Sequence, residues 1–265
     1  MYQTKFLFFL IFSISFLNAQ NLSNNLKGTY TTKNKSAMYS SFHFDGNGKV
    51  KVNDYEDEYI FYEKNDSIFI LVDKSPFVMV KNSKGVLKGI THWIENENFK
   101  SSTKNFEYAP SNSNHQRYLQ LLDQYYVLNF DKGFDLILEA QPDHRMATIE
   151  EIQLGNKKIC DQDFELACVQ EFAYRLTNML GGLESYLNGT PVEVKDDKGL
   201  LDLGKKIIRL GNPDGYGLIA SYYMALGDEE QSNNYLNQGL ENGCKICLEM
   251  EMNKMLQGLE AEVEN

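Results

Sequence analysis

The chain contains 265 residues, of which 26 are basic and 37 acidic, giving a formal net charge of −11. Hydrophobic residues make up 42% of the sequence, which is enough to bury an ordinary core and excludes a disordered, collagen-like or disulfide-dominated chain. The acidic balance argues against a dedicated nucleic-acid binder, which needs a basic surface. No nucleic-acid partner is therefore expected.

The charge is unevenly distributed along the chain. Residues 20–110 hold 12 basic and 11 acidic side chains, whereas residues 111–265 hold 13 basic and 26 acidic ones. A polar stretch at 110–114 separates the two regions. The sequence therefore predicts two domains of α+β class, an antiparallel β-domain over 20–109 and a helical domain over 115–265, joined by this linker.

Residues 1–19 have the pattern of a secretory signal peptide. One positive charge at Lys5 is followed by an apolar run over residues 6–17 and by a small residue, Ala19. The run is short for a hydrocarbon core of about 30 Å, although an uncleaved anchor or a core helix remains the alternative. We expect cleavage after Ala19, no membrane insertion afterwards, and a periplasmic or secreted protein.

The four cysteines are interpreted in the light of this export. In an oxidising compartment, Cys160 with Cys168 and Cys244 with Cys247 favour two local disulfides. Free or cross-paired thiols are one alternative, and a metal or redox site is another. The first pair lacks zinc-site spacing, and the Cys-x-x-Cys pair lies in a helical stretch rather than after a strand. We expect no metal and no cofactor.

Residues 26–102 form short β-type runs separated by turn residues. Residues 45–48, Asp-Gly-Asn-Gly, tolerate the positive φ of a tight hairpin turn, and Val50 and Val52 are expected to point inward on the returning strand. About eight strands predict an antiparallel meander that closes or half-closes into a small barrel. The expected strands are 28–32, 38–44, 49–52, 58–63, 67–72, 77–81, 85–91 and 93–99.

Three stretches of this region, 26–30, 42–50 and 86–90, resemble the small lipocalin-like or copper-resistance-type β-domains of exported bacterial proteins. The resemblance implies ligand or partner binding rather than catalysis. It leaves open a small-ligand carrier, with the ligand held inside the β-domain.

After the linker the hydrophobic period becomes helical, with further helix expected over 149–180. Residues 211–223 and 243–252 begin with glycines 32 residues apart, and Gly227 with Asp228 divides the intervening segment into a helix pair. One such pair cannot bury both of its faces, so stacking of pairs in an α-solenoid is predicted.

This last third resembles the Sel-one-like branch of tetratricopeptide-like repeats. The resemblance implies an α-solenoid adaptor that binds a protein or peptide. Some exported, cysteine-rich relatives are described as binding penicillin-like compounds, but no residue set here carries that property over. The half-repeat that begins at Gly243 departs from the family, because Met255 stands where a tyrosine is usual. The matching signature residues are Tyr186, Gly189, Gly211, Gly215, Tyr223 and Gly243, and Cys247 also fits.

The sequence lacks the common signatures of nucleophilic, phosphate-binding, dinucleotide-binding and zinc-protease sites. We therefore predict an exported, non-enzymatic binding protein whose helical domain holds a protein or peptide partner. Its acidic charge suits a basic partner, although solubility alone also explains that charge. The alternatives are a cell-wall or β-lactam amide hydrolase by family analogy, and the small-ligand carrier. Met250, Met252 and Met255 are interpreted as a core or capping stripe in preference to a partner surface.

Overall fold

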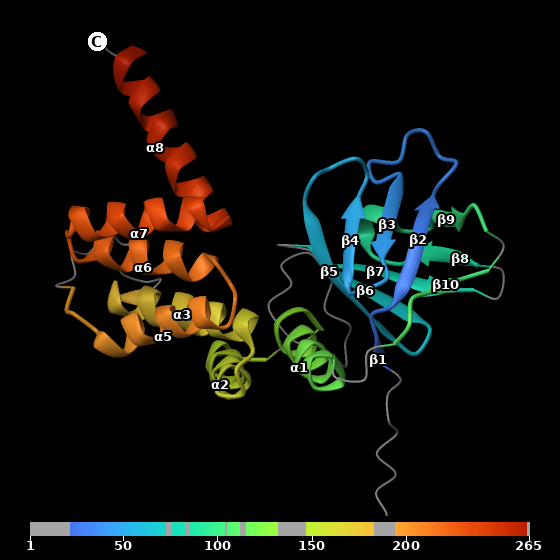
Figure 1. Ribbon diagram of the computed structural model, residues 1–265, viewed down its shortest axis with the longest axis horizontal. Coiled ribbons are helices and arrows are strands. Elements are labelled where there is room, and N and C mark those ends of the chain that lie inside the picture. Colours follow the sequence, from blue (N-terminus) through green and yellow to red (C-terminus); the bar gives the residue numbers. More distant parts are fainter. Residues whose placement is uncertain are drawn as a thin grey trace, which may run out of the picture. The chain divides into compact units, whose positions relative to one another are not determined.

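Figure 1 shows the computed structural model of the chain, which describes residues 22–72, 76–82, 85–103, 105–111, 115–131, 147–182 and 194–263. Two compact units are present, Met1–Leu119 and Gln120–Asn265, and each is described by itself. The division falls inside helix α1 (Gln116–Tyr126). The predicted cleavage residue Ala19, linker residues 112–114 and signature residues Tyr186 and Gly189 lie outside the described residues, and the predicted domain limits stay predictions.

The first unit is a closed antiparallel β-barrel of eight strands, counted over the described residues. Each strand from β2 to β9 pairs with the next along the chain, and β9 pairs back with β2, with Tyr30 opposite Ser101. Two short strands lie outside this closed order: β1 (Leu22–Ser23) pairs antiparallel with β5, and β10 (Glu107–Tyr108) pairs antiparallel with β2. The predicted meander is thus confirmed, and it closes. The barrel strands are β2 (Leu26–Thr31), β3 (Ser41–Asp45), β4 (Lys49–Val52), β5 (Glu58–Lys64), β6 (Ser67–Leu71), β7 (Phe77–Lys81), β8 (Val86–Gly89) and β9 (Asn98–Ser101).

The turn between β3 and β4 forms for the reason that the sequence suggests. The Asp45 carboxylate accepts the backbone N–H groups of Asn47 at 2.7 Å and Lys49 at 2.9 Å. Gly46 and Gly48 adopt φ values of 84° and 86°, where a residue with a Cβ would be strained. This local geometry fixes the register that turns Val50 and Val52 inward, as predicted.

Large apolar side chains fill the inside of the barrel. Phe42 meets Phe99 edge to face at 5.0 Å between ring centroids, and Phe44 meets Phe61 at 4.8 Å. Burying each such side chain contributes about 1.5–3 kcal/mol, so this core is the main source of the barrel's stability. The buried cluster comprises Leu26, Tyr30, Phe42, Phe44, Val50, Val52, Phe61, Ile68, Ile70, Phe77, Met79, Leu87, Ile94 and Phe99.

Several of the expected strands are shorter than predicted, and two of them begin well after the expected residue. The strand expected at 38–44 begins only at Ser41, and Met38 is exposed. The strand expected at 93–99 is instead a 3₁₀ turn, η1 (His92–Ile94), followed by β9. Ile94 turns into the core while the neighbouring Trp93 remains about half exposed, a pattern that resembles strand alternation in the sequence but belongs to a turn here.

The second unit is helical. The expected helical stretch 149–180 is present as two helices, α2 and α3, which are separated by a turn in which Asp163 has a φ of 64°. Neighbouring helices pack in the order α2–α3–α5–α6–α7, and α8 packs on α6 and α7 (Figure 1). None of the helices in the described part is long and apolar enough to cross a membrane. The elements are α1, followed by the short π-helix η3 (Val127–Asp131), and then α2 (Ile149–Cys160), α3 (Glu165–Met179), α5 (Lys198–Arg209), α6 (Asp214–Ala225), α7 (Glu229–Glu241) and α8 (Lys245–Val263).

Side-chain caps explain where several of these helices begin. Thr148 and Glu151 form a reciprocal capping box at α2. Asp197 accepts the Leu200 N–H at the start of α5, and Asp228 accepts the Gln231 N–H at the start of α7. Each cap satisfies an N–H group that has no partner within the helix.

Candidate functional site

The signature glycines that the structure describes lie at helix ends and at a close helix contact. Gly211 follows α5 with a φ of 89°, and Gly243 follows α7 with a φ of 77°. These conformations suit glycine, which ends a helix without a Cβ clash. Within α6, a Cβ on Gly215 would lie 2.9 Å from the Gly204 carbonyl oxygen of α5. The absence of a side chain there lets the two helices approach.

The signature tyrosine lies in the contact between α6 and α7. The ring of Tyr223 stacks on that of Tyr235, with centroids 5.7 Å apart and planes 19° from parallel. In the same helix contact, Ser232 of α7 donates a hydrogen bond to the Ala220 carbonyl of α6 at 2.9 Å. The predicted helix pair around Gly227 is present, and these residues hold it together.

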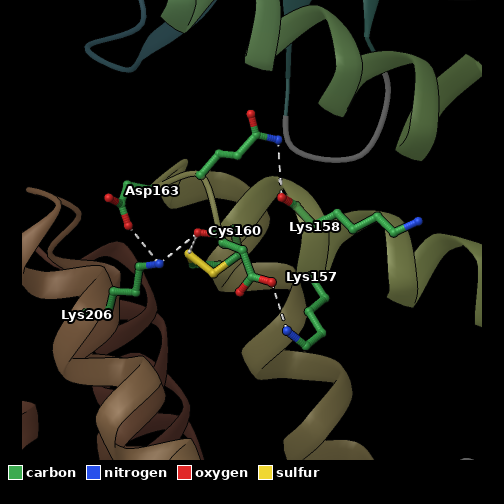
Figure 2. Close-up of polar contacts among 8 residues, drawn as sticks. Lys157, Lys158, Cys160, Asp163 and Lys206 are labelled. Carbon is green, nitrogen blue, oxygen red and sulfur yellow. Dashed lines mark hydrogen bonds and ion pairs between the residues drawn. A yellow bond between two sulfur atoms is a disulfide. The ribbon is translucent and has the colours of Figure 1, made fainter.

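Both predicted disulfides are present. Cys160 and Cys168 are joined with an S–S distance of 2.07 Å and link the end of α2 to the first turn of α3. Lys206 of α5 donates to the Cys160 carbonyl at 2.8 Å and forms an ion pair with Asp163 at 2.8 Å, as Figure 2 shows. The bridge therefore closes the corner between α2 and α3, and Lys206 ties α5 to that corner.

The second disulfide joins Cys244 and Cys247 at the start of α8. The sequence predicts this Cys-x-x-Cys in a helical stretch rather than after a strand, and the structure confirms this, because the pair lies between helix α7 and the first turn of α8. Burial limits its reactivity, since the two residues are 2% and 0% exposed. Glycines accommodate the sulfur atoms: a Cβ on Gly217 would lie 3.1 Å from the Cys244 Sγ, and one on Gly239 would overlap the Cys247 Sγ.

The acidic pair before α5, Asp196 and Asp197, makes specific contacts. Asp196 accepts a short hydrogen bond from the Tyr222 hydroxyl, which in turn accepts the Asp197 N–H at 2.9 Å. Burial and the Asp196 bond raise the pKa of Tyr222 to about 12. Arg175 of α3 pairs with Asp197 at 2.7 Å. Partial burial works against ionisation of Asp197, but Arg175 and backbone N–H groups outweigh it and lower its pKa.

The barrel carries a polar cluster that sequence reasoning missed. Lys81 forms an ion pair with the buried Glu63 at 2.5 Å and bonds the Tyr108 hydroxyl at 3.2 Å. Its ammonium lies 5.9 Å from the centre of the Phe106 ring. Burial lowers the pKa of Lys81, but the Glu63 and Tyr108 contacts more than compensate, so the net change is upward. No sequence signal pairs Glu63 with a lysine 18 residues away.

Tyr30 lies near this cluster and its hydroxyl is buried. Burial, together with the charges of Tyr108, Glu107 and Glu63, raises its pKa. Among the residues that the structure describes, the Tyr30 hydroxyl and one carboxylate oxygen of Glu63 find no hydrogen-bond partner. The cluster contains a cation, a carboxylate and phenols, and its one ion pair neutralises the buried charge.

Helix α8 has two apolar faces, of which one is covered. Ile246, Cys247 and Met250 pack against the cluster formed by α6 and α7. The opposite side carries four exposed apolar side chains, which we call the α8 stripe. Its members are Leu248, Met252, Met255 and Leu256, with exposed fractions of 55%, 54%, 61% and 56%.

The α8 stripe changes the interpretation of the methionines. Met250 is partly buried and packs against the core, as expected, and it accepts a hydrogen bond from Ser221 at 3.6 Å. Met252 and Met255 instead lie on the uncovered side, where no other described element contacts them as a core. A contiguous exposed apolar patch of this kind is typical of an interaction surface.

No family model, curated protein or solved structure matches this chain. Within the described residues, no group of three or more His, Cys, Asp and Glu side chains is placed to hold a metal ion. The features that define a site are therefore geometric: a disulfide-braced helical layer with one uncovered apolar helix face, and a barrel with a filled interior.

Proposed function

We propose that the chain is an exported, non-enzymatic binding protein whose helical domain holds a protein partner. The observation that carries this proposal is the α8 stripe. A surface helix normally buries its apolar side against another element of the protein. The four large apolar side chains of the α8 stripe are instead about half exposed, so they leave hydrophobic surface in contact with water. Covering that surface with a partner removes it from water.

The helical-repeat assignment belongs to the same proposal. Gly211 and Gly243 stand 32 residues apart and have the same role, each ending a helix in the left-handed conformation. Gly215 and Gly217 both admit close contact with a neighbouring helix. Repeats of this kind bury their apolar faces against neighbouring repeats, and the helices described here leave the α8 stripe exposed.

Export is supported by the signal-like residues 1–19 and by the two disulfides, which persist in oxidising compartments. The barrel interior is filled by aromatic side chains in contact, which favours an external rather than an internal binding surface on that unit. The proposal therefore places partner binding on the helical unit.

A photo-crosslinking amino acid introduced at Met252 tests this function in the full-length protein. We expect one discrete crosslinked product with a second protein in an extract of the source cell envelope, and its loss when Leu248→Asp is added on the same face. The matched control carries the crosslinker at Lys51, an exposed position on barrel strand β4. Identical products from both positions, or no product from Met252, would contradict the proposal.

A further inference from the structure

The chemistry on either side of the α8 stripe specifies what can cover it. At 3.6 residues per turn, successive residues are about 100° apart, so the stripe occupies an arc of about 100°. On the same wheel Glu249 lies about 20° beyond Leu256, and Glu251 lies about 40° beyond Met255. Glu249 is exposed and Glu251 is partly exposed. The apolar surface is thus bordered by a carboxylate on each side.

Positive charge is scarce near this surface. Residues 211–263 contain nine Asp and Glu but only two lysines and no arginine. Lys254 donates to the Asn233 side chain of α7 at 2.9 Å and so is directed toward α7 rather than toward the stripe. Lys245, in the first turn of α8, is exposed and lies on the wheel within the arc of the stripe, so it borders the stripe at its N-terminal end. Residues 211–263 thus carry a net charge of −7, and the side chains that flank the stripe along its two long sides are the acidic Glu249 and Glu251.

A helix suits this surface better than an extended peptide. The stripe follows spacings of three and four residues along one helix, and another helix presents matching side chains at the same spacings. An extended peptide gains its affinity from backbone hydrogen bonds to a strand edge, whereas the backbone groups within a helix are already paired. Two methionines in the stripe add side chains that adapt to partners of differing shape.

A second copy of the chain fits less well. In a pair formed through two α8 stripes, Glu249 and Glu251 of each copy would border the same interface, and like charges there oppose association. A partner that carries Lys or Arg at these flanking positions replaces this repulsion by attraction.

We propose that the α8 stripe binds a basic amphipathic helix of another protein, with its apolar face on Leu248, Met252 and Met255 and its cationic flanks facing Glu249 and Glu251. This inference rests on the proposed function and specifies its partner. The carboxylates set orientation and association rate, while the apolar contacts supply most of the affinity.

Three synthetic peptides test whether the stripe prefers a basic amphipathic helix. Each has about 18 residues, because shorter isolated helices are only marginally stable in water. The first has leucines on one face and lysines on its flanks, the second replaces each lysine with glutamate, and the third scrambles the first. Binding of each fluorescent peptide to the full-length protein is measured by anisotropy at several salt concentrations. We expect the basic amphipathic peptide to bind at least tenfold more tightly than either of the others, and its advantage over the acidic one to shrink as salt rises.

Variants on the protein locate the site. The double variant Glu249→Lys with Glu251→Lys should weaken binding of the basic peptide about tenfold, since two exposed attractive contacts become repulsive. Met252→Ser should also weaken it about tenfold by removing a central apolar contact. The matched control, Glu56→Lys with Asp57→Lys in the barrel, changes the net charge equally and should alter the Kd less than twofold. Circular dichroism confirms that each variant is folded.

Several results would overturn the inference: equal binding of the basic and acidic peptides, equal weakening by the barrel control, or stripe-dependent dimers in sedimentation experiments. Stripe-dependent binding to vesicles of phosphatidylethanolamine and phosphatidylglycerol in place of the peptide would also do so. If crosslinking at Met252 still captures a protein while the basic peptide fails, the partner chemistry is wrong and the proposed function stands. If both fail, both are wrong.

Discussion

Replacing Lys81 with methionine tests the polar cluster of the barrel. The side chain of Glu63 is 2% exposed and that of Lys81 is 14% exposed, so the Lys81→Met change leaves a carboxylate buried without its cation. Breaking a buried pair from one side typically costs about 3–5 kcal/mol, and the partial exposure of Lys81 favours the lower end, about 3 kcal/mol. Removing both partners, by Glu63→Met with Lys81→Met, should recover most of this loss.

Urea unfolding followed by tryptophan fluorescence measures the effect on the barrel specifically, because Trp93 is the only tryptophan and lies in the first unit. Lys51→Met provides the control: its ion pair with Glu58 is long, at 3.9 Å, and exposed, so the loss should stay below about 1 kcal/mol. A loss below about 1 kcal/mol for Lys81→Met, or a double variant as unstable as the single one, would contradict a buried Glu63–Lys81 ion pair.

The same pair predicts a pH dependence at the alkaline end. The folded pKa of Lys81 is raised above its ordinary value of 10.5. Stability from this lysine is therefore fully present below about pH 10.5 and is lost as the pH rises through the higher folded value. The free-energy difference between wild type and Lys81→Met should accordingly be constant near neutral pH and shrink only in strong alkali.

Three further predictions concern the helical unit. Gly239→Ala places a methyl group against the Cys247 sulfur and should cost about 1–3 kcal/mol; an unchanged thermal midpoint by circular dichroism would contradict this. Arg175→Gln should destabilise by less than about 1 kcal/mol at pH 7, because the pair is more than a third exposed. Asp197 has a lowered folded pKa, so urea titrations should show this effect shrinking as the pH falls below about 4. Mass spectrometry of the unreduced, exported protein should find no alkylatable thiol and two disulfide-linked cysteine pairs, whereas free thiols would refute the assigned bridges.

The β-barrel was predictable because its determinants are local. Alternation of apolar residues with turn residues sets each strand and hairpin, and a run of short hairpins of equal hand closes into a barrel. The failures fall where alternation is ambiguous. Trp93 and Ile94 fit a strand pattern in sequence, but Ile94 lies in a 3₁₀ turn in which its N–H donates to the Thr91 carbonyl. Gly89 of β8 flanks this turn through backbone hydrogen bonds with Asn96 and Glu97. That arrangement depends on contacts with neighbouring strands, which sequence alone does not show.

The disulfides also followed from the sequence, since cysteines three and eight residues apart can meet within one turn or one corner of a helical chain. The role of the Cys244 and Cys247 pair did not follow. Its position at the start of α8 depends on where α7 ends at Gly243, and its inertness depends on burial between three helices. Helix boundaries are set by caps and packing together, so the sequence left them uncertain.

Several features follow from residues close together in the chain and could therefore be predicted from the sequence: the two classes of secondary structure, the order of strands and helices, the inward side of β4 and the pairing of the cysteines. The contact of Lys81 with Glu63 and the uncovered side of α8 depend instead on how distant segments pack. In sequence, Met250 and Met252 are equivalent apolar residues on a helix. Which of them is buried depends on where α6 and α7 lie, and this packing leaves the α8 stripe, bordered by its two glutamates, facing solvent.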